Sequence, residues 1–130
     1  MGLPITTISG GICFAFPNVC LTQIGPATVP IPYPSIGQLK DAGGTSKVMA
    51  GGKNVVRIAD SIATSTGDAA GQTGVKSGQP PGGAVKFTQG SSSVFADGSA
   101  VVRMFDPTSQ NNDNAVGIVL GGLPSVLVGG

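Results

Sequence analysis

The chain has 130 residues and a net charge of +1, and it contains no Glu, His or Trp. Its length allows one domain, which we expect to span residues 1–130. Because His is the commonest general base and neutral metal ligand, its absence excludes Ser–His–Asp and Cys–His catalysis and most zinc chemistry. The five scattered Lys form no basic patch that would indicate binding of nucleic acid.

Stiff β-branched side chains dominate the composition, with 14 Val, 9 Ile and 10 Thr against 6 Leu. Such side chains pack well on pleated strands and lose rotamer freedom in helices. Gly and Pro make up a quarter of the chain and supply many turns. The composition therefore predicts an all-β domain of short strands, with no significant helix.

The first 39 residues carry no charged side chain and contain six of the ten Pro. The sequence PATVPIPYP at 26–34 predicts an extended, polyproline-like segment or a sheet edge, because Pro cannot donate a ladder hydrogen bond. No basic region precedes the apolar N-terminus, so we expect no secretory signal peptide. No apolar run is long enough to cross a bilayer, so we expect no integral membrane protein.

A repeat follows, in which VMAGGKNVVRIAD at 48–60 matches VFADGSAVVRMFD at 94–106 without a gap. Each copy predicts a β-hairpin with a Gly-Gly or Asp-Gly turn. The only two Arg of the chain fall in the same register, three residues before an Asp. We expect Arg57 with Asp60, and Arg103 with Asp106, to form structural ties that hold the turns.

The segment at 63–83 is rich in Gly, Ser, Thr and Pro and predicts an ordered loop or a surface excursion. GGLPSVLVGG at 121–130 resembles the start of another copy of the repeat. Several hairpins of one design predict a compact cone or a small folded sandwich.

The C-terminal segment 114–130 is also free of charge. Both neutral segments are either core or an apolar face that docks onto another protein, and we favour docking because a small domain has limited core. We expect Ile31 and Val128 to lie on this docking face, at the flat base of the cone.

Cys13 and Cys20 are interpreted as small buried hydrophobes, although a disulfide and a mixed metal site with Asp60 and Asp106 stay open. An Asp-dependent hydrolase is a remote alternative, since the neighbouring Arg would keep both carboxylates ionised. We expect no enzyme and no catalytic residue. The alternative function is a secreted β-rich adhesin or carbohydrate-binding module.

Three segments resemble the PAAR-like spike-tip family, FPNVCLTQIGPATVPIPYPSI at 16–36, STGDAAG at 65–71 and FADGSAVVRMFDPTSQNN at 95–112. The positions of the name-giving Pro-Ala-Ala-Arg tetrapeptide read Asn-Val-Val-Arg at 54–57 and Ala-Val-Val-Arg at 100–103. The resemblance spans roughly residues 12 to 130.

The resemblance implies a small β cone with pseudo-three-fold repeats that caps a trimeric β-helical spike. Such tips belong to contractile injection machines, including type VI secretion systems, phage tails and related extracellular particles. It implies one tip monomer per spike trimer, no homo-oligomer, and a role in piercing the target envelope, with effector cargo as a further partner. The tip would be cytoplasmic in the producing cell and ejected with the spike.

PAAR tips are typically stabilised by a metal that several His and a Cys hold. In this chain Gln110 stands where the family pattern would place a His. We therefore expect no cofactor and no metal, with zinc as the alternative.

Overall fold

Strands form most of the regular structure of residues 2–130, which a computed structural model describes. In chain order the strands are β1 (Leu3–Ile5), β2 (Ile12–Ile24), β3 (Ala27–Gln38), β4 (Thr45–Ala50), β5 (Lys53–Val55), β6 (Ser61–Ile62), β7 (Thr73–Gly74), β8 (Val85–Phe87), β9 (Phe95–Ala96), β10 (Ser99–Ala100), β11 (Pro107–Gln110), β12 (Ala115–Leu120) and β13 (Leu123–Val128). A single 3-10 turn, Leu39–Asp41, is the helical structure of this part of the chain. The all-β class is confirmed.

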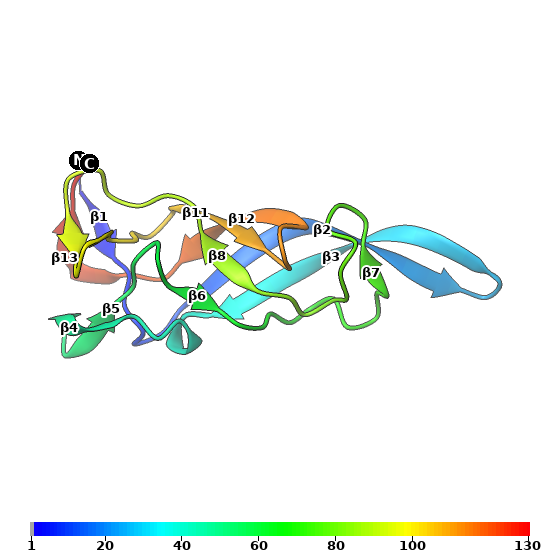
Figure 1. The fold of residues 1–130 in the computed structure, drawn as a ribbon, viewed down its shortest axis with the longest axis horizontal. Coiled ribbons are helices and arrows are strands. Elements are labelled where there is room, and N and C mark those ends of the chain that lie inside the picture. Colours follow the sequence, from blue (N-terminus) through cyan, green and yellow to red (C-terminus); the bar gives the residue numbers. More distant parts are fainter. Residues whose placement is uncertain (1) are drawn as a thin grey trace.

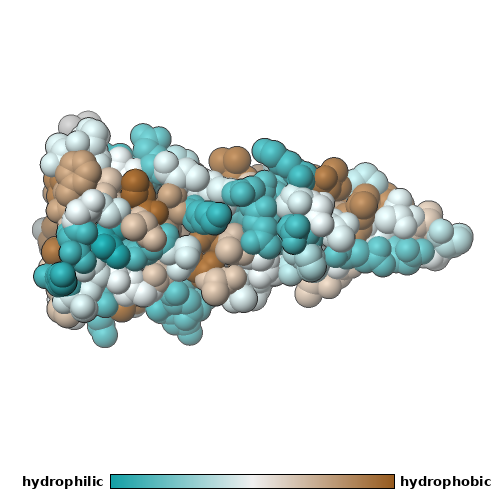
Figure 2. All heavy atoms as spheres, viewed as in Figure 1, coloured by the Kyte–Doolittle hydropathy of each residue, from teal (hydrophilic) through white to brown (hydrophobic). Residues whose placement is uncertain are grey.

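The molecule is an elongated cone with a blunt and a pointed end (Figures 1 and 2). Strands β1 and β13 lie at the blunt end, and the β2–β3 hairpin projects to the point (Figure 1). We call the blunt end the base and the turn at residues 24–27 the apex. Among residues 2–130, no helix has the length and apolarity needed to traverse a bilayer.

The largest sheet has the strand order β3-β2-β12-β11-β8-β6, and β7 adds a further pair to β2. The expectation of short strands is wrong for β2 and β3, which have 13 and 12 residues and stay paired from Ile12–Gln38 to Ile24–Ala27. Pro17 lies inside β2, where a register shift between Ala15 and Asn18 accommodates it.

Strand β3 forms an edge of this sheet, so its Pro residues do not interrupt a ladder. Its outward-facing backbone positions can be identified because the N–H of Ile36 donates away from β2, to the carbonyl of Thr66 at 2.9 Å. Alternate residues of a strand face the same way. Pro30, Pro32 and Pro34 share that outward direction, and none of them has an N–H to offer.

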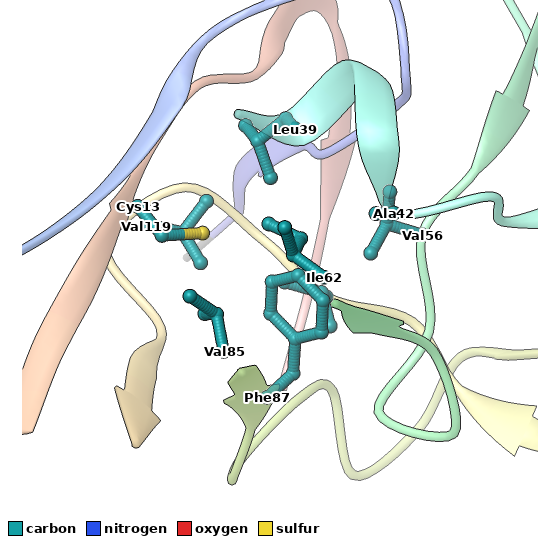
Figure 3. Close-up of a cluster of buried hydrophobic side chains, with 9 residues drawn as sticks. Cys13, Leu39, Ala42, Val56, Ile62, Val85, Phe87 and Val119 are labelled. Atoms are coloured by element: carbon teal, nitrogen blue, oxygen red, sulfur yellow. The ribbon is translucent and has the colours of Figure 1, made fainter. Parts of the chain in front are cut away.

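The main core lies beneath the large sheet, where apolar side chains from distant segments meet (Figure 3). It contains Cys13, Leu39, Ala42, Val56, Ile62, Val85, Phe87, Val102 and Val119. The alternation in β12 explains its share: Ala115, Gly117 and Val119 face inward, and Val116 and Ile118 are exposed. A period of two is what a half-buried strand requires.

The turn between β11 and β12 has an unusual backbone. Asn111, Asn112 and Asp113 all have positive φ, at 52°, 54° and 70°. Asn and Asp tolerate this left-handed region better than other residues with a Cβ, because their short polar side chains bond locally. The Asn-rich sequence thus forms a left-handed turn that projects Asn111 and Asn114 into the interior of the cone.

Candidate docking base and buried polar network

Three two-stranded sheets form the base: β4–β5, β9–β10 and β13–β1. We call them the first, second and third hairpin. They pack around a second apolar cluster of Ile5, Val55, Ala96, Val101 and Val128, with Ala50 and Leu123 against it. The first two hairpins are the copies of the sequence repeat, with both turn residues at positive φ in each.

The third hairpin is a third copy of the repeat, split between the two ends of the sequence. In the first two hairpins the residue before the two-residue turn pairs with the residue after it, Ala50 with Lys53 and Ala96 with Ser99. In the third hairpin no turn joins the strands, but Val128 at the end of β13 pairs in the same way with Leu3 at the start of β1. The first and third hairpins also share a shift in strand register. It lies between Thr45 and Met49 in β4, and between Leu123 and Leu127 in β13. The echo at 121–130 is therefore the first strand of this copy, and residues 3–10 continue it.

A ring of backbone hydrogen bonds joins the three copies in cyclic order. The N–H of Thr6 donates to Val102 O at 3.0 Å, that of Val102 to Val56 O at 2.9 Å, and that of Val56 to Thr6 O at 3.0 Å. These three residues occupy the same position in their copies. The base thus has pseudo-three-fold symmetry in its hydrogen bonding as well as in its sequence.

Exposed apolar side chains occupy equivalent positions on all three hairpins. Val48, Val94 and Val126 are 38%, 38% and 37% exposed, and Met49, Phe95 and Leu127 are 56%, 61% and 62% exposed. Scattered single apolar residues are ordinary on a surface, but a repeated set around one axis is not. We call these six side chains the base array.

The two Arg–Asp pairs have the same geometry in the first and second copies. In each, the Arg backbone N–H and Nε donate to one carboxylate oxygen, and Nη2 lies 2.9 Å from the other. The hydrogen bonds to Asp60 raise the pKa of Arg57 above its usual value. The carboxylate thus closes the bend after each second strand, as a structural tie does.

Each Arg also reaches the turn of the following copy. Arg57 Nη1 lies 3.6 Å from Asp97 Oδ2, and Arg103 Nη1 donates to Gly129 O at 3.4 Å. The third copy has Thr7 and Gly10 in the places of the Arg and the Asp. Thr7 bonds within its own copy, to Ser9.

The structure does not bring Ile31 and Val128 together. Val128 belongs to the base but is only 3% exposed, because it packs in the apolar cluster between the hairpins. Ile31 pairs with Cys20 in the projecting hairpin, away from the base. The expectation that both neutral segments build one flat base is thus corrected: residues 12–38 form the long hairpin, because their Pro residues fit a sheet edge.

A buried polar network, which the sequence analysis did not identify, joins this hairpin to the Gly-rich excursion. At its centre, Asn18 donates to Asp68 Oδ2 at 2.8 Å and accepts at Oδ1 from the amides of Asn111 and Asn114. The second oxygen of Asp68 accepts from the N–H of Gly82 at 3.0 Å. Asn111 accepts in turn from Gly83, and Asn114 from Lys76 and Ser77.

Gln110 stands where the family pattern would place a metal-binding His, but its side-chain amide is taken up by hydrogen bonds within the protein. Its Nε2 donates to Ser35 O at 2.9 Å and Cys13 O at 3.3 Å, and its Oε1 accepts from Thr108 at 2.8 Å. An amide N–H donor has no lone pair for a cation. The residues at this position therefore do not fit the metal of the family.

The two Cys are buried and unbridged. Burial raises the pKa of the Cys13 thiol to about 12. Burial and the charge of Asp68 raise the pKa of Cys20. Residues 2–130 contain no cluster of three or more His, Cys, Asp or Glu that could hold an ion. Cys13, Cys20, Asp60 and Asp106 thus do not form the mixed site left open by the sequence.

Comparison with known families agrees with this architecture. The model of the toxin PAAR-like domain family matches residues 11–117, a range that includes both Arg–Asp pairs and Gln110. Comparisons with curated proteins and with solved structures give no match. Since the family match covers most of the chain, the chain belongs to the toxin PAAR-like domain family.

Proposed function

We propose that this domain is a spike tip, which caps a trimeric β-helical spike of a contractile injection machine and leads it through the target envelope. Its role is structural rather than enzymatic. The base docks on the spike, and the apex points away from it. The tip is made in the cytoplasm of the producing cell and leaves that cell with the spike.

The observation that carries the proposal is the base array. A monomer can make three similar contacts with a three-fold partner only if it presents similar groups around one axis. The three hairpins present them in the same register, and the ring at Thr6, Val56 and Val102 holds them in cyclic order. Exposed apolar groups repeated in this way favour an apolar three-fold end as the partner.

The charges near the base array support an apolar rather than an ionic contact. Lys47 and Arg57 both lie within 3.6 Å of Asp97, so these charges compensate each other locally. Burial of apolar area depends weakly on salt, unlike an electrostatically steered contact. Tip binding should therefore persist at high salt.

The test is co-expression with candidate trimeric β-helical spike proteins, followed by native mass spectrometry. We expect a complex of three spike chains and one tip, because one base presents all three contacts. A symmetric complex with three tips would contradict the proposal, as would failure of every candidate trimer from the same gene cluster to bind.

Charge insertion tests which surface docks. Phe95→Asp and Leu127→Asp each strand a carboxylate in an apolar contact, which is costly because the charge loses water without gaining a partner. We expect each variant to weaken spike binding at least about tenfold, which corresponds to about 1.4 kcal/mol. Fluorescence anisotropy with labelled tip measures this affinity.

Ile24→Asp is the matched control, since Ile24 is 53% exposed and lies at the apex. It should bind like the unaltered protein. Val128→Asp is not a usable probe, because Val128 is core. If Ile24→Asp weakens binding and both base variants bind normally, the orientation of the tip on the spike is reversed.

A further inference from the structure

The third hairpin differs from the other two in how the chain closes it. Gly51 and Gly52 connect β4 to β5, and Asp97 and Gly98 connect β9 to β10. In contrast, β13 and β1 come from opposite ends of the sequence. Pairing them brings distant segments together, which costs more conformational entropy than a two-residue turn.

The third hairpin also lacks the tie that stabilises its counterparts. Arg57 and Arg103 each bind an Asp three residues later in a buried or half-buried pair. Thr7 and Gly10 stand in those places, and Thr7 makes hydrogen bonds to Ser9 where the Arg residues bind an Asp. Arg57 forms an ion pair with Asp97 in the turn of the second hairpin. Thr7 carries no charge and cannot form the equivalent ion pair with the turn of the first hairpin.

The hydrogen bonds between copies separate into those that need the third copy and those that do not. Ile58 N–H donates to Ala100 O and Val102 N–H to Val56 O, both between the first and second copies. Four backbone bonds at the other two junctions all require residues 4–8; the end of β13 is held separately, by side-chain bonds from Ser91 and Arg103 to Gly129 O. The four backbone bonds run from Thr6 to Val102, from Met104 to Pro4, from Val56 to Thr6 and from Ile8 to Asn54.

From these three differences we infer that the third hairpin opens locally in the free tip and closes when the base docks on its trimeric partner. The inference rests on the proposed function, because the docked trimer is what closes it. Val126 and Leu127 belong to both the third hairpin and the base array. A partner that binds only the closed arrangement shifts the equilibrium toward it.

Amide hydrogen exchange by NMR on the free tip tests the opening. We expect Thr6, Ile8, Val56 and Met104 to exchange at least about tenfold faster than Ile58 and Val102, as local opening requires. The amides of Val56 and Met104 are decisive, because they lie in the first and second copies and lose only their acceptors. If they exchange as slowly as Ile58 and Val102, the inference is wrong.

Exchange in the presence of saturating spike trimer tests the closure. The four fast amides should slow to the rate of Ile58 and Val102. A trimer that binds without slowing them overturns this inference and leaves the proposed function standing. If no candidate trimer binds, the proposed function fails, and closure by docking fails with it.

A rearranged chain offers an independent test. Joining Gly130 directly to Leu3 reproduces the two-residue turn of the other hairpins, and new ends can be opened between the exposed Gln79 and Pro80. We expect all six amides of this variant to exchange alike without the trimer. The control has the same new chain ends but a long Gly/Ser linker between residues 130 and 3. In this control, the amides of Thr6, Ile8, Val56 and Met104 should still exchange faster than the other two. Equal exchange patterns in the two variants would overturn the inference.

Discussion

Arg103 and Asp106 form the more buried of the two equivalent ion pairs. Their side chains are 9% and 4% exposed, against 16% and 9% for Arg57 and Asp60. Removal of one partner from a buried pair leaves a charge without compensation, so the loss of stability exceeds the net value of the pair. Loss of Arg103 should therefore destabilise the protein more than loss of Arg57, although the two pairs have the same hydrogen bonds.

Arg103→Ala should lower the free energy of unfolding by about 3 kcal/mol, and Arg57→Ala by somewhat less. Lys47→Ala is the control, because Lys47 is 75% exposed and its ion pair should contribute less than about 1 kcal/mol. Urea denaturation followed by circular dichroism measures all three. If both Arg variants unfold at the urea concentration of the unaltered protein, the pairs do not hold the bends.

Asn18 joins the excursion and the β11–β12 turn through one side chain. Its replacement by Ala would remove one buried hydrogen bond each from the amides of Asn111 and Asn114 and from the carboxylate of Asp68. Asp68 would keep its bond from Gly82, and Asn114 its bond to Val19 O. A lost hydrogen bond costs about 0.5–1.5 kcal/mol, and one to a charged group about 1.5–3 kcal/mol. Asn18→Ala should therefore lower the unfolding free energy by about 3 kcal/mol, while Gln23→Ala, at an exposed position of the same strand, should change it little.

The position of Gln110 leads us to expect a protein without a resident metal. Purified tip should contain no stoichiometric zinc or iron by mass spectrometry, and a chelator should leave its melting temperature unchanged. The reason is that Gln110, at the place of the family His, already uses its amide in hydrogen bonds to Ser35 and Thr108. About one equivalent of zinc retained after dialysis would refute this expectation.

The edge of β3 shows how Pro can protect a strand from association. Pro30, Pro32 and Pro34 remove three successive outward N–H groups, and the outward N–H of Ile36 donates to the carbonyl of Thr66. An exposed edge with free donors is a template for pairing with other chains. The long hairpin can therefore project into solvent without attracting a neighbouring strand.

Pro30→Val combined with Pro32→Val should preserve the fold and promote association in proportion to protein concentration, because two donors are restored in a β-favouring segment. Multi-angle light scattering over a concentration series measures the change. Pro80→Val, at an exposed position of the excursion, is the control and should stay monomeric. A double variant that remains monomeric at the highest concentration would show that something else protects this edge.

Local signals in the sequence were sufficient to predict some elements and not others. The two hairpins of the repeat follow from turn residues between apolar strands, and the Pro-rich segment follows from the missing donors of Pro. The length of β2 could not be predicted, because it depends on its partner strands β3, β12 and β7 and on a register shift at Pro17. Nothing in the sequence indicated that Asn18 and Asn114 interact, since only the fold brings positions 18 and 114 together.

For the molecule as a whole, the pseudo-three-fold base was only partly visible in the sequence. The third copy is divided between residues 126–130 and 3–10, so a search for contiguous repeats finds only half of it. The sequence also did not indicate which apolar residues of the base are exposed. In β13, the neighbouring residues Val126 and Leu127 are both exposed, and Val128 is buried. An irregular strand does not follow the period of two by which faces are assigned.

The β2–β3 hairpin has a consequence for how the leading half of the molecule responds to its surroundings. Between Ile12 and Gln38 there is no Asp, Glu, His, Lys or Arg, and burial raises the pKa of both thiols in this stretch. A change in the acidity of the medium thus has no carboxylate, imidazole or amine here to act on. If the apex leads, the hairpin carries no carboxylate, imidazole or amine of its own between compartments of different acidity, and the carboxylate that contacts it, at Asn18, belongs to Asp68 of the excursion.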